Sequence, residues 1–324
     1  MDGFGGDYAP EQIAAGCLQA ADIARIPILL TGDQKKLESL IKDKPGSELI
    51  EIVHASEQIG MEEAPIEAVR KKKESSLVVA ANLVRQKKAA ALISAGNTGA
   101  CMAASLLNIG RVRGIERPAI TCLMPTLNGV CLIVDAGANV DCRPKYLLQF
   151  AQMGSIYAEK VLAVAKPRIG LLNIGEEPHK GNDLSQKSYQ LLANSELNFI
   201  GNVEGRDISH GEVDVVVCDG FVGNTIIKFA EGLGSALFSM LKTEFMKSTP
   251  RKIAASVLRP GLKNIAKKMD YTEYGGAPLL GVNGAVIIAH GTSNQKAIYN
   301  AIRAAKTAVD NQVVQSIAEI MAGE

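Results

Sequence analysis

Apolar residues recur along this chain in short, mostly continuous runs. Their lengths predict β-strands at residues 28–30, 49–53, 89–93, 120–123, 130–134, 169–172, 199–200, 213–217 and 285–288. Because most of these runs do not alternate with polar residues, we expect strands that are covered on both faces. Helical patterns lie between them, at residues 10–24, 65–86, 98–109, 144–162, 184–193, 222–246 and 293–322. Strands joined by helices favour right-handed crossovers, so the pattern predicts an α/β sandwich with a mainly parallel sheet.

The same pattern bears on domain organisation. The chain has 324 residues, 47% of them hydrophobic, which is enough for a sizeable core. It contains no low-complexity linker and no internal repeat, so we expect a single α/β domain over residues 1–324. One embellishment is expected, a small helical hairpin at about residues 249–270, where Pro260 and Gly261 separate two short helical patterns.

Composition narrows the kinds of function. A formal net charge of +1 gives no electrostatic reason to expect nucleic acid as a partner. The sequence shows no signal-peptide pattern and no run of about 18 apolar residues, so we expect a cytoplasmic protein. The six cysteines form no C-x-x-C pair and the four histidines are not spaced like zinc ligands. We therefore expect reduced cysteines and no metal.

A glycine turn gives the first indication of a ligand. Residues 93–101 read I-S-A-G-N-T-G-A-C, between a predicted strand and a predicted helix. Gly96 and Gly99 allow backbone N–H groups to face outward at the helix N-terminus, where the unpaired donors and the helix dipole favour an anion such as phosphate. The turn matches neither of the common nucleotide-binding glycine motifs, and a tight strand-to-helix connection is the alternative interpretation.

Further loops with glycine, amide and charged residues follow other predicted strands. They are residues 94–99, 135–141, 173–182, 201–207 and 219–224. Ligands of open parallel sheets bind beyond the carboxyl ends of the strands, so we expect these loops to meet at one sheet edge and to share a pocket. The alternative is that turns simply need Gly, Asn and Asp.

Within these loops, several side chains suit phosphate and acyl chemistry. Lys180, beside Gly181 and Asn182, places an ammonium near N–H donors, and a solvated lysine is the alternative interpretation. Amides are available to bind phosphate or a thioester-derived oxyanion, or only to cap turns. The carboxylates are available to orient a cation or substrate, or only to cap helices. The amides are Asn97, Asn202 and Asn224, and the carboxylates are Asp135, Glu176, Glu177, Glu204 and Asp219.

Covalent catalysis has no support in the sequence. His179 and His290 lie beside the loops and are candidate general bases, with a structural role as the alternative. No G-x-S-x-G motif precedes a helix, and no cysteine lies in an evident Cys/His setting. Direct transfer is therefore the better hypothesis.

The loops, in this order, resemble the PlsX-type phosphate acyltransferases of bacterial phospholipid synthesis over essentially the whole chain. The segments that carry the resemblance are G-G-D-Y-A-P (5–10), S-A-G-N-T-G-A (94–100), G-A-N-V-D-C-R-P (137–144), G-L-L-N-I-G-E-E-P-H-K-G-N (170–182), F-I-G-N-V-E-G-R-D (199–207), V-V-C-D-G-F-V-G-N (216–224) and D-Y-T-E-Y-G-G-A-P-L-L-G (270–281).

The resemblance implies a fold and a reaction. The fold is a Rossmann-like three-layer α/β/α sandwich, similar to phosphotransacetylases and isopropylmalate dehydrogenases. The reaction moves a fatty acyl group from acyl carrier protein to inorganic phosphate, giving acyl phosphate for a downstream glycerol-phosphate acyltransferase. A homodimer and peripheral contact with the inner face of the cell membrane are also implied.

Combined with the loop chemistry, the resemblance yields a site hypothesis. We expect phosphate to be held by Asn97, Thr98, Gly99, Lys180 and Asn182. We expect Asn202 or Asn224 to stabilise the oxyanion, with His179 as a further catalytic candidate. Additional substrate contacts are expected from Asp7, Asn139, Glu204 and Asp219.

The chain departs from the family at its start. Family members usually begin with a short strand that ends in V-D-x-M-G-G-D, whereas here Met1 directly precedes Asp2 and Phe4 replaces the methionine. A first strand is therefore expected to be missing, which leaves the sheet order near Asp2 and Asp7 open.

Two basic segments suggest partners. Acyl carrier protein is acidic, and candidate docking residues are Arg70, Lys71, Lys72 and Lys73, or alternatively Arg111 and Arg113. A solvated helix face is the other interpretation. Residues 251–268 contain six basic and no acidic residues, interleaved with apolar Val257, Leu258 and Leu262, which indicates contact with an anionic membrane. A dimer-contact helix is the alternative.

Other functions remain open at this stage. A phosphotransacetylase that uses acyl-CoA would share the fold and the chemistry. An NAD-dependent isopropylmalate-type dehydrogenase would need a metal-binding carboxylate cluster and a cofactor loop, and the sequence shows neither with confidence, so no cofactor is expected. A non-catalytic membrane scaffold is a third alternative.

Overall fold

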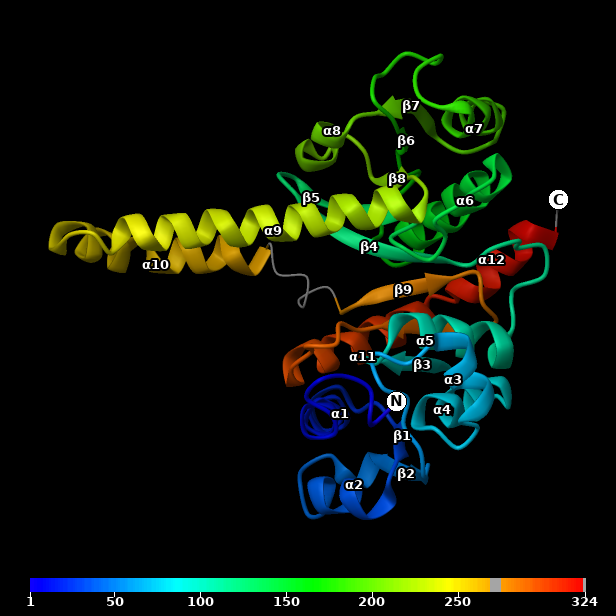
Figure 1. The fold of residues 1–324 in the computed structure, drawn as a ribbon, viewed down its shortest axis with the longest axis vertical. Helices are drawn as coiled ribbons and strands as arrows, with labels where there is room; N and C mark the ends of the chain where they lie inside the picture. The colour runs from blue at the N-terminus through cyan, green and yellow to red at the C-terminus, as the bar shows by residue number, and fades with distance from the viewer. Residues whose placement is uncertain (269–274, 323–324) are drawn as a thin grey trace.

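The computed structural model describes residues 1–268 and 275–322 (Figure 1). The strands are β1 (Ile28–Gly32), β2 (Ile50–His54), β3 (Ala91–Ser94), β4 (Ala119–Thr126), β5 (Gly129–Val134), β6 (Ile169–Leu172), β7 (Phe199–Val203), β8 (Val215–Val217), β9 (Ala277–Leu280) and β10 (Ala285–Ile288). The helices are α1 (Glu11–Ala24), α2 (Gln34–Ile41), η1 (Ser47–Leu49), α3 (Pro65–Lys71), α4 (Ser76–Arg85), α5 (Thr98–Ala104), η2 (Ser105–Ile109), α6 (Pro144–Lys160), α7 (Asp183–Ala193), α8 (Gly205–His210), α9 (Gly220–Phe245), α10 (Thr249–Lys268), α11 (Gln295–Asp310) and α12 (Val313–Ala322).

A continuous sheet runs through the molecule in the order β3-β10-β9-β4-β5-β8-β6-β7. In Figure 1 it crosses the body from β3, in cyan, to β7, in green, with helices on both faces. Four of its pairings are parallel and three, all involving β9 or β4, are antiparallel. The mainly parallel α/β sandwich is confirmed.

The antiparallel strands β4 and β9 reverse the direction of the sheet partway across. Strands β3 and β10 consequently run opposite to β5, β8, β6 and β7. The expectation that five loops leave the same sheet edge is therefore wrong, because the loop after β3 leaves from the edge opposite to the other four. The sequence pattern missed β9, whose second residue is Pro278, a residue uncommon inside strands.

Local signals also divide two of the predicted helices. The pattern at 65–86 is broken because Ser75 caps α4, its hydroxyl accepting from the Val78 N–H at 3.4 Å. The pattern at 293–322 is broken at Gln312, whose φ is +55°. The remaining predicted helices and strands are found with ends shifted by a few residues or fewer.

Buried residues from both faces of the sheet form the core. The strand β8 is fully buried, with Val215, Val216 and Val217 all inaccessible to solvent. Helix α6 covers one region of the sheet with Phe150 and Met153, both fully buried, and α11 covers another with its apolar face. Continuous apolar strands are buried on both faces, as the absence of alternation predicts.

The first three residues occupy a slot between β1 and β3. The Thr31 N–H donates to the Met1 carbonyl, the Gly3 N–H to the Thr31 carbonyl and the Asp2 N–H to the Ile93 carbonyl, each at 2.9 Å. These bonds place Asp2 between the small β1–β2 pair and the larger sheet, which answers the question of strand order that the sequence left open. Residues 1–3 thus pair with β1 on one side and with β3 on the other.

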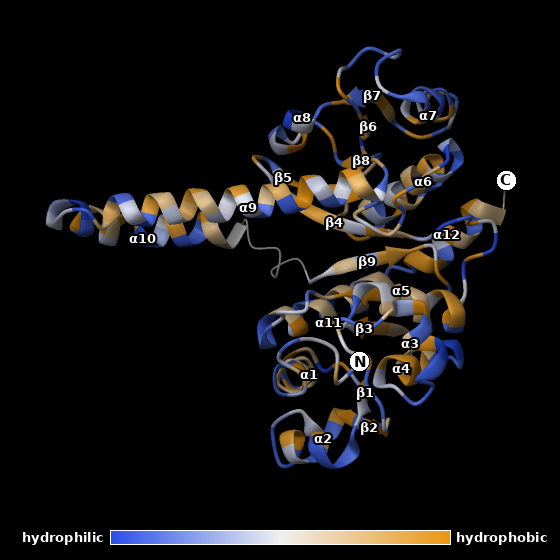
Figure 2. Cartoon of the chain, viewed as in Figure 1, coloured by the Kyte–Doolittle hydropathy of each residue, from blue (hydrophilic) through white to orange (hydrophobic). Residues whose placement is uncertain are grey.

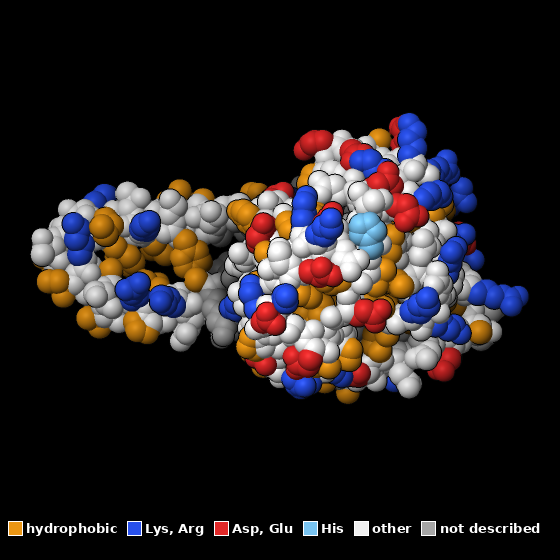
Figure 3. All heavy atoms as spheres, turned by 90° about the horizontal axis from the view of Figure 1, so that it is seen from below, with side chains coloured by type: hydrophobic (Ala, Val, Ile, Leu, Met, Phe, Trp, Pro, Cys, Tyr) orange, Lys and Arg blue, Asp and Glu red, His pale blue; other side chains and the backbone are white. Residues whose placement is uncertain are grey.

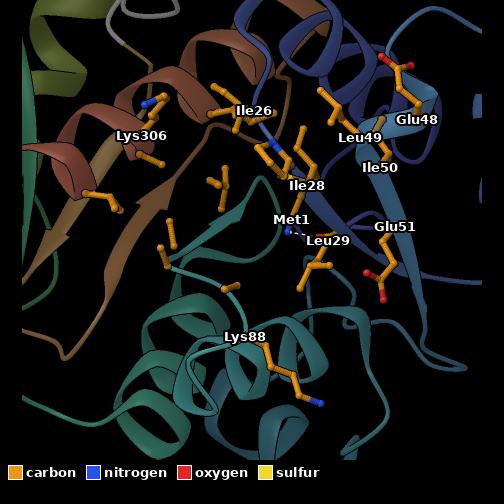
Figure 4. Close-up of a pocket in the computed structure, with 18 residues that line it drawn as sticks. Met1, Ile26, Ile28, Leu29, Glu48, Leu49, Ile50, Glu51, Lys88 and Lys306 are labelled. Carbon is orange, nitrogen blue, oxygen red and sulfur yellow. Dashed lines mark hydrogen bonds between the residues drawn. The ribbon is translucent and has the colours of Figure 1, made fainter.

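The rest of the slot is a cavity of about 550 Å³ (Figure 4). It is walled by β1, the residues before and within β3, and α11. The Met1 amine points into this region and donates to the Leu29 carbonyl at 2.7 Å. Burial lowers the pKa of that amine from its ordinary value.

A long two-helix arm, residues 229–268, projects from the body (Figures 1 and 2). It consists of the later part of α9, packed on α10. The expectation of two short helices at 249–270 is wrong, since α10 is one helix of 20 residues that continues through Pro260 and Gly261. A proline inside a helix removes one backbone hydrogen bond, and the turns on either side keep theirs. Residues 269 and 270 of that expected hairpin lie outside the described residues.

Candidate active site

The glycine turn after β3 is held by side chains on both sides. Asn97 caps α5: its Oδ1 accepts from the Ala100 N–H at 3.0 Å, while its Nδ2 donates to the carbonyls of Met61 and Glu63 at 2.8 and 3.1 Å. The Asn97 amide is thus engaged in holding the turn against the segment before α3. The exposed Thr98 and the half-buried Gly99 provide first-turn N–H groups, which have no acceptor within a helix.

Gly99 is a packing requirement as well as a turn residue. A Cβ at this position would lie 2.7 Å from Pro65 Cγ. The start of α3 is therefore pressed against the start of α5. A side chain larger than hydrogen would push the two helices apart.

Asp2 and Ser94 hold the glycine turn through buried hydrogen bonds. Ser94 Oγ donates to Asp2 Oδ2 at 2.7 Å and accepts from the Gly96 N–H at 3.1 Å, and both residues are buried. Sequence reasoning assigned neither residue a role, because they are 92 positions apart and nothing in their spacing links them.

The segment 5–7 and the loop 290–292 complete this side of the site. The Asp7 N–H donates to the Gly291 carbonyl at 2.8 Å, and the Asp7 carboxylate is exposed beside it. His290 Nδ1 lies 2.8 Å from Thr292 Oγ1. The structure therefore brings Asp7 and His290 together at the end of β10, next to β3.

The loop after β5 is organised by the buried Asp135. Its Oδ1 accepts from the N–H groups of Ile120, Gly137 and Ala138 at 3.0 to 3.2 Å. Its Oδ2 accepts from the backbone and side-chain N–H groups of Asn139 at 2.6 and 2.9 Å. Burial raises the pKa of the Asp135 carboxyl, and these hydrogen bonds partly offset that effect.

Asn139, a predicted substrate contact, is committed to this loop. Its Nδ2 also donates to the Pro118 carbonyl at 2.8 Å, and its own carbonyl accepts from the Gly220 N–H at 2.7 Å. It therefore joins the loop to the residue before β4 on one side and to the start of α9 on the other.

The first turn of α9 lies directly on this loop and separates two cavities. The first, which we call the Thr98–Asn224 cavity, has a volume of about 370 Å³ and includes Gly137 and His290 among its lining residues. The second, the Asn182–Asp219 cavity, has a volume of about 560 Å³. The single shared pocket expected from the sequence is thus divided in the structure.

In the Thr98–Asn224 cavity, Asn224 is the amide best placed to act on a ligand. It is exposed, and its Cβ lies 3.5 Å from the position that a Cβ on Gly137 would take. No hydrogen bond from its side chain is found within residues 1–268 and 275–322. The rest of the lining is mostly apolar and comes from β4, α9, β9 and β10.

In the Asn182–Asp219 cavity, the predicted residues serve as helix caps. Asn182 Oδ1 accepts from the Ser185 N–H at the start of α7, and Asp219 Oδ1 from the Val222 N–H at the start of α9, both at 2.9 Å. Lys180 lies in the same loop, with its Nζ 3.8 Å from Glu177 Oε1 and a side chain that is 42% exposed. His179 is exposed, and neither it nor Lys180 is among the residues lining the two cavities.

The loop after β7 is held mainly by structural contacts. Asn202 is buried and donates through Nδ2 to the Glu177 carbonyl at 2.8 Å, while its Oδ1 has no partner among the described residues. Glu204 precedes α8 and pairs with Arg206 at 2.8 Å. These contacts tie the β7 loop to the β6 loop. The roles predicted for Lys180, His179, Asn202 and Glu204 stay predictions.

The basic segment at 70–73 begins in the last turn of α3, the helix that packs on α5. Lys71 pairs with Glu67 at 2.5 Å and Lys72 with Glu63 at 2.7 Å. Arg70 and Lys73 are exposed and form no ion pair within the part of the chain that the structure describes. In the alternative basic pair, Arg111 donates to the Glu116 carbonyl.

All six cysteines are free, and four of them are buried, as expected from the sequence. Burial raises the pKa of Cys122, in the Thr98–Asn224 cavity, to about 11. Its thiol is therefore neutral at physiological pH, which agrees with the absence of a nucleophilic cysteine in the sequence reasoning.

The fold resembles those of a solved phosphotransacetylase and a solved phosphotransacylase. A phosphotransacetylase from Streptococcus pyogenes superposes with a TM-score of 0.63 at 18% identity, covering 95% of this chain and 91% of its own. A branched-chain phosphotransacylase from Enterococcus faecalis V583 gives a TM-score of 0.57 at 15% identity, covering 94% and 96%. At such identities the likeness establishes the fold, which is that of the phosphotransacetylases.

Sequence comparison is more specific. A family model described as "Fatty acid synthesis protein" matches residues 1–316. Proteins named phosphate acyltransferase are 51% identical in Thermoanaerobacterium thermosaccharolyticum, over 98% of this chain and 94% of that protein, and 51% identical in Heliobacterium modesticaldum, over 100% and 97%. The relative from Nostoc sp. is 49% identical over 98% and 94%. Agreement of this extent over nearly the whole chain makes it a member of the PlsX-type phosphate acyltransferase family.

Proposed function

We propose that this protein transfers a fatty acyl group from acyl carrier protein to inorganic phosphate and releases acyl phosphate for phospholipid synthesis. The observation that carries the proposal is the Thr98–Asn224 cavity, where helix N-terminal N–H groups and an uncommitted amide open onto an apolar space. An anion site joined to an apolar site suits a reaction between phosphate and a fatty thioester. The family and the phosphotransacetylase fold support it.

The reaction requires the protein mainly to position the two substrates and to stabilise negative charge. A phosphate oxygen attacks the thioester carbonyl, a C–O bond forms, and a tetrahedral oxyanion results. The C–S bond then breaks, and the thiolate takes a proton from water. Phosphate near neutral pH is already partly dianionic, and a thiol with a pKa of about 8.5 is a good leaving group. Proximity and oxyanion stabilisation are the main contributions required.

Each role has a candidate in the structure. The backbone N–H groups of Thr98 and Gly99 would receive phosphate, while Asn97 holds their turn in place. The Asn224 amide, across the cavity, would donate to the oxyanion. Asn182 lines the neighbouring cavity and Lys180 lies in the same loop outside its lining, so a second, more distant contact with the substrate is the role that we propose for them.

The acyl donor is the point that separates this function from its nearest alternative. The fold neighbours are phosphotransacetylases, which favours acyl-CoA as a second candidate donor. The decisive assay supplies acyl carrier protein or CoA carrying the same acyl group, with phosphate, and measures free thiol and acyl phosphate. We expect the carrier-protein thioester to give the higher kcat/KM. Higher kcat/KM with acyl-CoA would favour the alternative, and thiol release without phosphate would contradict both.

We further propose that Arg70 and Lys73 receive the acidic carrier protein. They lie at the end of α3, whose first residue, Pro65, contacts Gly99. A carrier protein bound there would have its prosthetic arm close to the Thr98–Asn224 cavity. Because Lys71 and Lys72 are already paired with glutamates, the uncompensated charge of the segment is at Arg70 and Lys73.

The arm suggests association with a membrane and with a second copy of the chain. Its exposed apolar residues include Phe229, Leu233, Leu237 and Met240 along one side of α9, and Ile253, Val257 and Leu258 on α10, while Leu262 is half-buried. Figure 3 shows that the arm carries both apolar side chains, in orange, and basic side chains, in blue. The described residues contain no helix long and apolar enough to span a bilayer.

We assign the two sides of the arm to different partners. The basic residues Lys252, Arg259 and Lys263 of α10 are exposed and suit anionic headgroups at the inner face of the cell membrane, whereas Arg251 is paired with Glu244. The apolar stripe of α9 carries fewer charges and suits the same stripe of a second copy, giving a homodimer.

A further inference from the structure

The Thr98–Asn224 cavity extends well beyond the two residues for which it is named. Ile120, Cys122 and Leu123 line it from β4, and Ile227 lines it from α9. Ile120 and Ile227 are buried, and Cys122 is half-buried. These side chains present hydrocarbon and a neutral thiol, a surface that offers no hydrogen bonds to a polar ligand.

The cavity is elongated along α9. Asn224 lies at one end of the lining, Ile227 and Lys228 about one turn later, and Glu231 one turn further still. From Asn224 to Glu231 the helix rises by about 10 Å. Lys228 and Glu231 form an ion pair at 2.8 Å. Cys122 packs against the buried cluster that contains Ile227. The cavity therefore runs from polar groups at Asn224, between β4 and α9, to an ion pair at the rim.

We propose that this cavity holds the hydrocarbon chain of the acyl group and that Cys122 and Ile227 determine how long a chain is accepted. The inference rests on the proposed function. The thioester carbonyl would lie at Asn224 and Thr98, and the chain would extend along α9 past Ile227 toward Cys122. A polar substrate would leave its groups unpaired against Ile120, Leu123 and Ile227, so the occupant is an alkyl chain.

Acyl chains of different length provide the test of this proposal. Burying one methylene contributes enough to change binding about fourfold, so a side chain that fills part of the cavity removes this gain for each methylene it displaces. Short acyl groups end before Cys122 and would be indifferent to its size. Long acyl groups pass it and would be excluded by a larger residue.

The experiment compares butyryl and palmitoyl groups on acyl carrier protein in full-length variants. We expect Cys122→Phe to lower kcat/KM for the palmitoyl substrate at least tenfold and to leave that for the butyryl substrate within about twofold. Ile227→Ala should shift preference the opposite way, toward the longer or bulkier chain. Thr225→Phe is the matched control, because Thr225 is exposed on α9 and lines neither cavity.

The possible results separate the two levels of the proposal. If Cys122→Phe changes both substrates equally, or neither, the chain does not pass Cys122 and the inference is wrong while the proposed function stands. If the unmodified protein makes no acyl phosphate from either substrate, the proposed function itself fails. Should Cys122→Phe not fold by circular dichroism, Cys122→Leu and Ile227→Ala carry the same comparison with smaller changes in volume.

Discussion

Gly223 lies so close to Asp135 that a Cβ added to it would be 2.0 Å from the Asp135 carbonyl oxygen. The first turn of α9 therefore rests directly on the loop that Asp135 organises. Asn224 is the next residue, so its position over Gly137 depends on this contact. The absence of a side chain at Gly223 therefore helps to position the Asn224 amide, to which we assign a catalytic role.

Gly223→Ala should consequently disturb both folding and activity. The added methyl group forces α9 away from the loop, and overpacking of this kind costs about 1–3 kcal/mol in the free energy of unfolding. We also expect a fall in kcat, because Asn224 moves with the helix. Gly232→Ala is the matched control, since a Cβ there meets open space, and its unfolding free energy should be unchanged or higher by up to about 1 kcal/mol. Equal behaviour of the two variants would contradict the packing argument.

Asn224→Ala tests the oxyanion assignment. Loss of one oxyanion donor lowers kcat by about 100-fold or more, with a much smaller change in the KM for phosphate. Lys180→Ala is the informative comparison, because Lys180 lies outside the Thr98–Asn224 cavity. It should mainly raise the phosphate KM or lower kcat modestly. Wild-type kinetics for Lys180→Ala would remove that residue from the site, and wild-type kcat for Asn224→Ala would remove Asn224.

Charge reversal at Arg70 and Lys73 tests carrier-protein docking. The double variant Arg70→Glu, Lys73→Glu should raise the KM for acyl carrier protein about tenfold at low ionic strength, and less at high salt. The KM for phosphate should not change. Lys187→Glu, on α7 at the opposite end of the sheet, reverses an exposed charge without affecting the proposed surface. An unchanged carrier-protein KM in the double variant would reject the surface.

Leu258→Glu tests the membrane-facing side of the arm. The Leu258 side chain is 54% exposed, and a carboxylate among the basic residues of α10 opposes both burial in a bilayer and attraction to anionic lipid. We expect binding to phosphatidylglycerol vesicles in flotation to fall by about tenfold. Leu127→Glu, 79% exposed between β4 and β5, is the control. Undiminished binding would refute the assignment, and a change in mass by light scattering would assign α10 to the dimer instead.

The buried Met1 amine predicts how stability depends on pH. Its pKa in the folded chain is lowered from the ordinary value of 8.0, so below that pH the unfolded chain binds a proton that the folded chain lacks. The free energy of unfolding should therefore rise with pH and level off above about pH 8, and decrease as the pH falls toward the folded pKa. Urea unfolding from about pH 6 to 8.5 measures the slope. Acetylation of the amine should remove this contribution, and an identical slope after acetylation would contradict it.

Several features of the fold were predictable because they depend on local sequence. Continuous apolar runs such as 169–172 and 285–288 coincide with β6 and β10, since a strand buried on both faces has no polar positions. The strand β9 was missed because its second residue is Pro278, which is uncommon inside strands. That one omission concealed the reversal of the sheet, and with it the fact that the glycine turn leaves the sheet from the edge opposite to the other four loops.

The candidate site was predictable in its loops but not in its contacts. Asn97, Asn182 and Asp219 were identified from residue type, and whether such side chains cap a helix or bind a ligand depends on neighbours that sequence does not specify. Asp2 and Ser94 meet only through the fold. The apolar lining at Ile120 and Ile227 looks like core in sequence, because a cavity wall and a packed interior use the same residues.

Helix α9 connects the proposed active site to the arm. It has 26 residues, about 39 Å of helix, with its first turn fixed on the Asp135 loop and its last turn at the tip of the arm. A displacement of the tip of the arm is transmitted along α9 to its first turns, where Asn224 lies. Whatever surface the arm contacts is thereby mechanically connected to the geometry around the thioester.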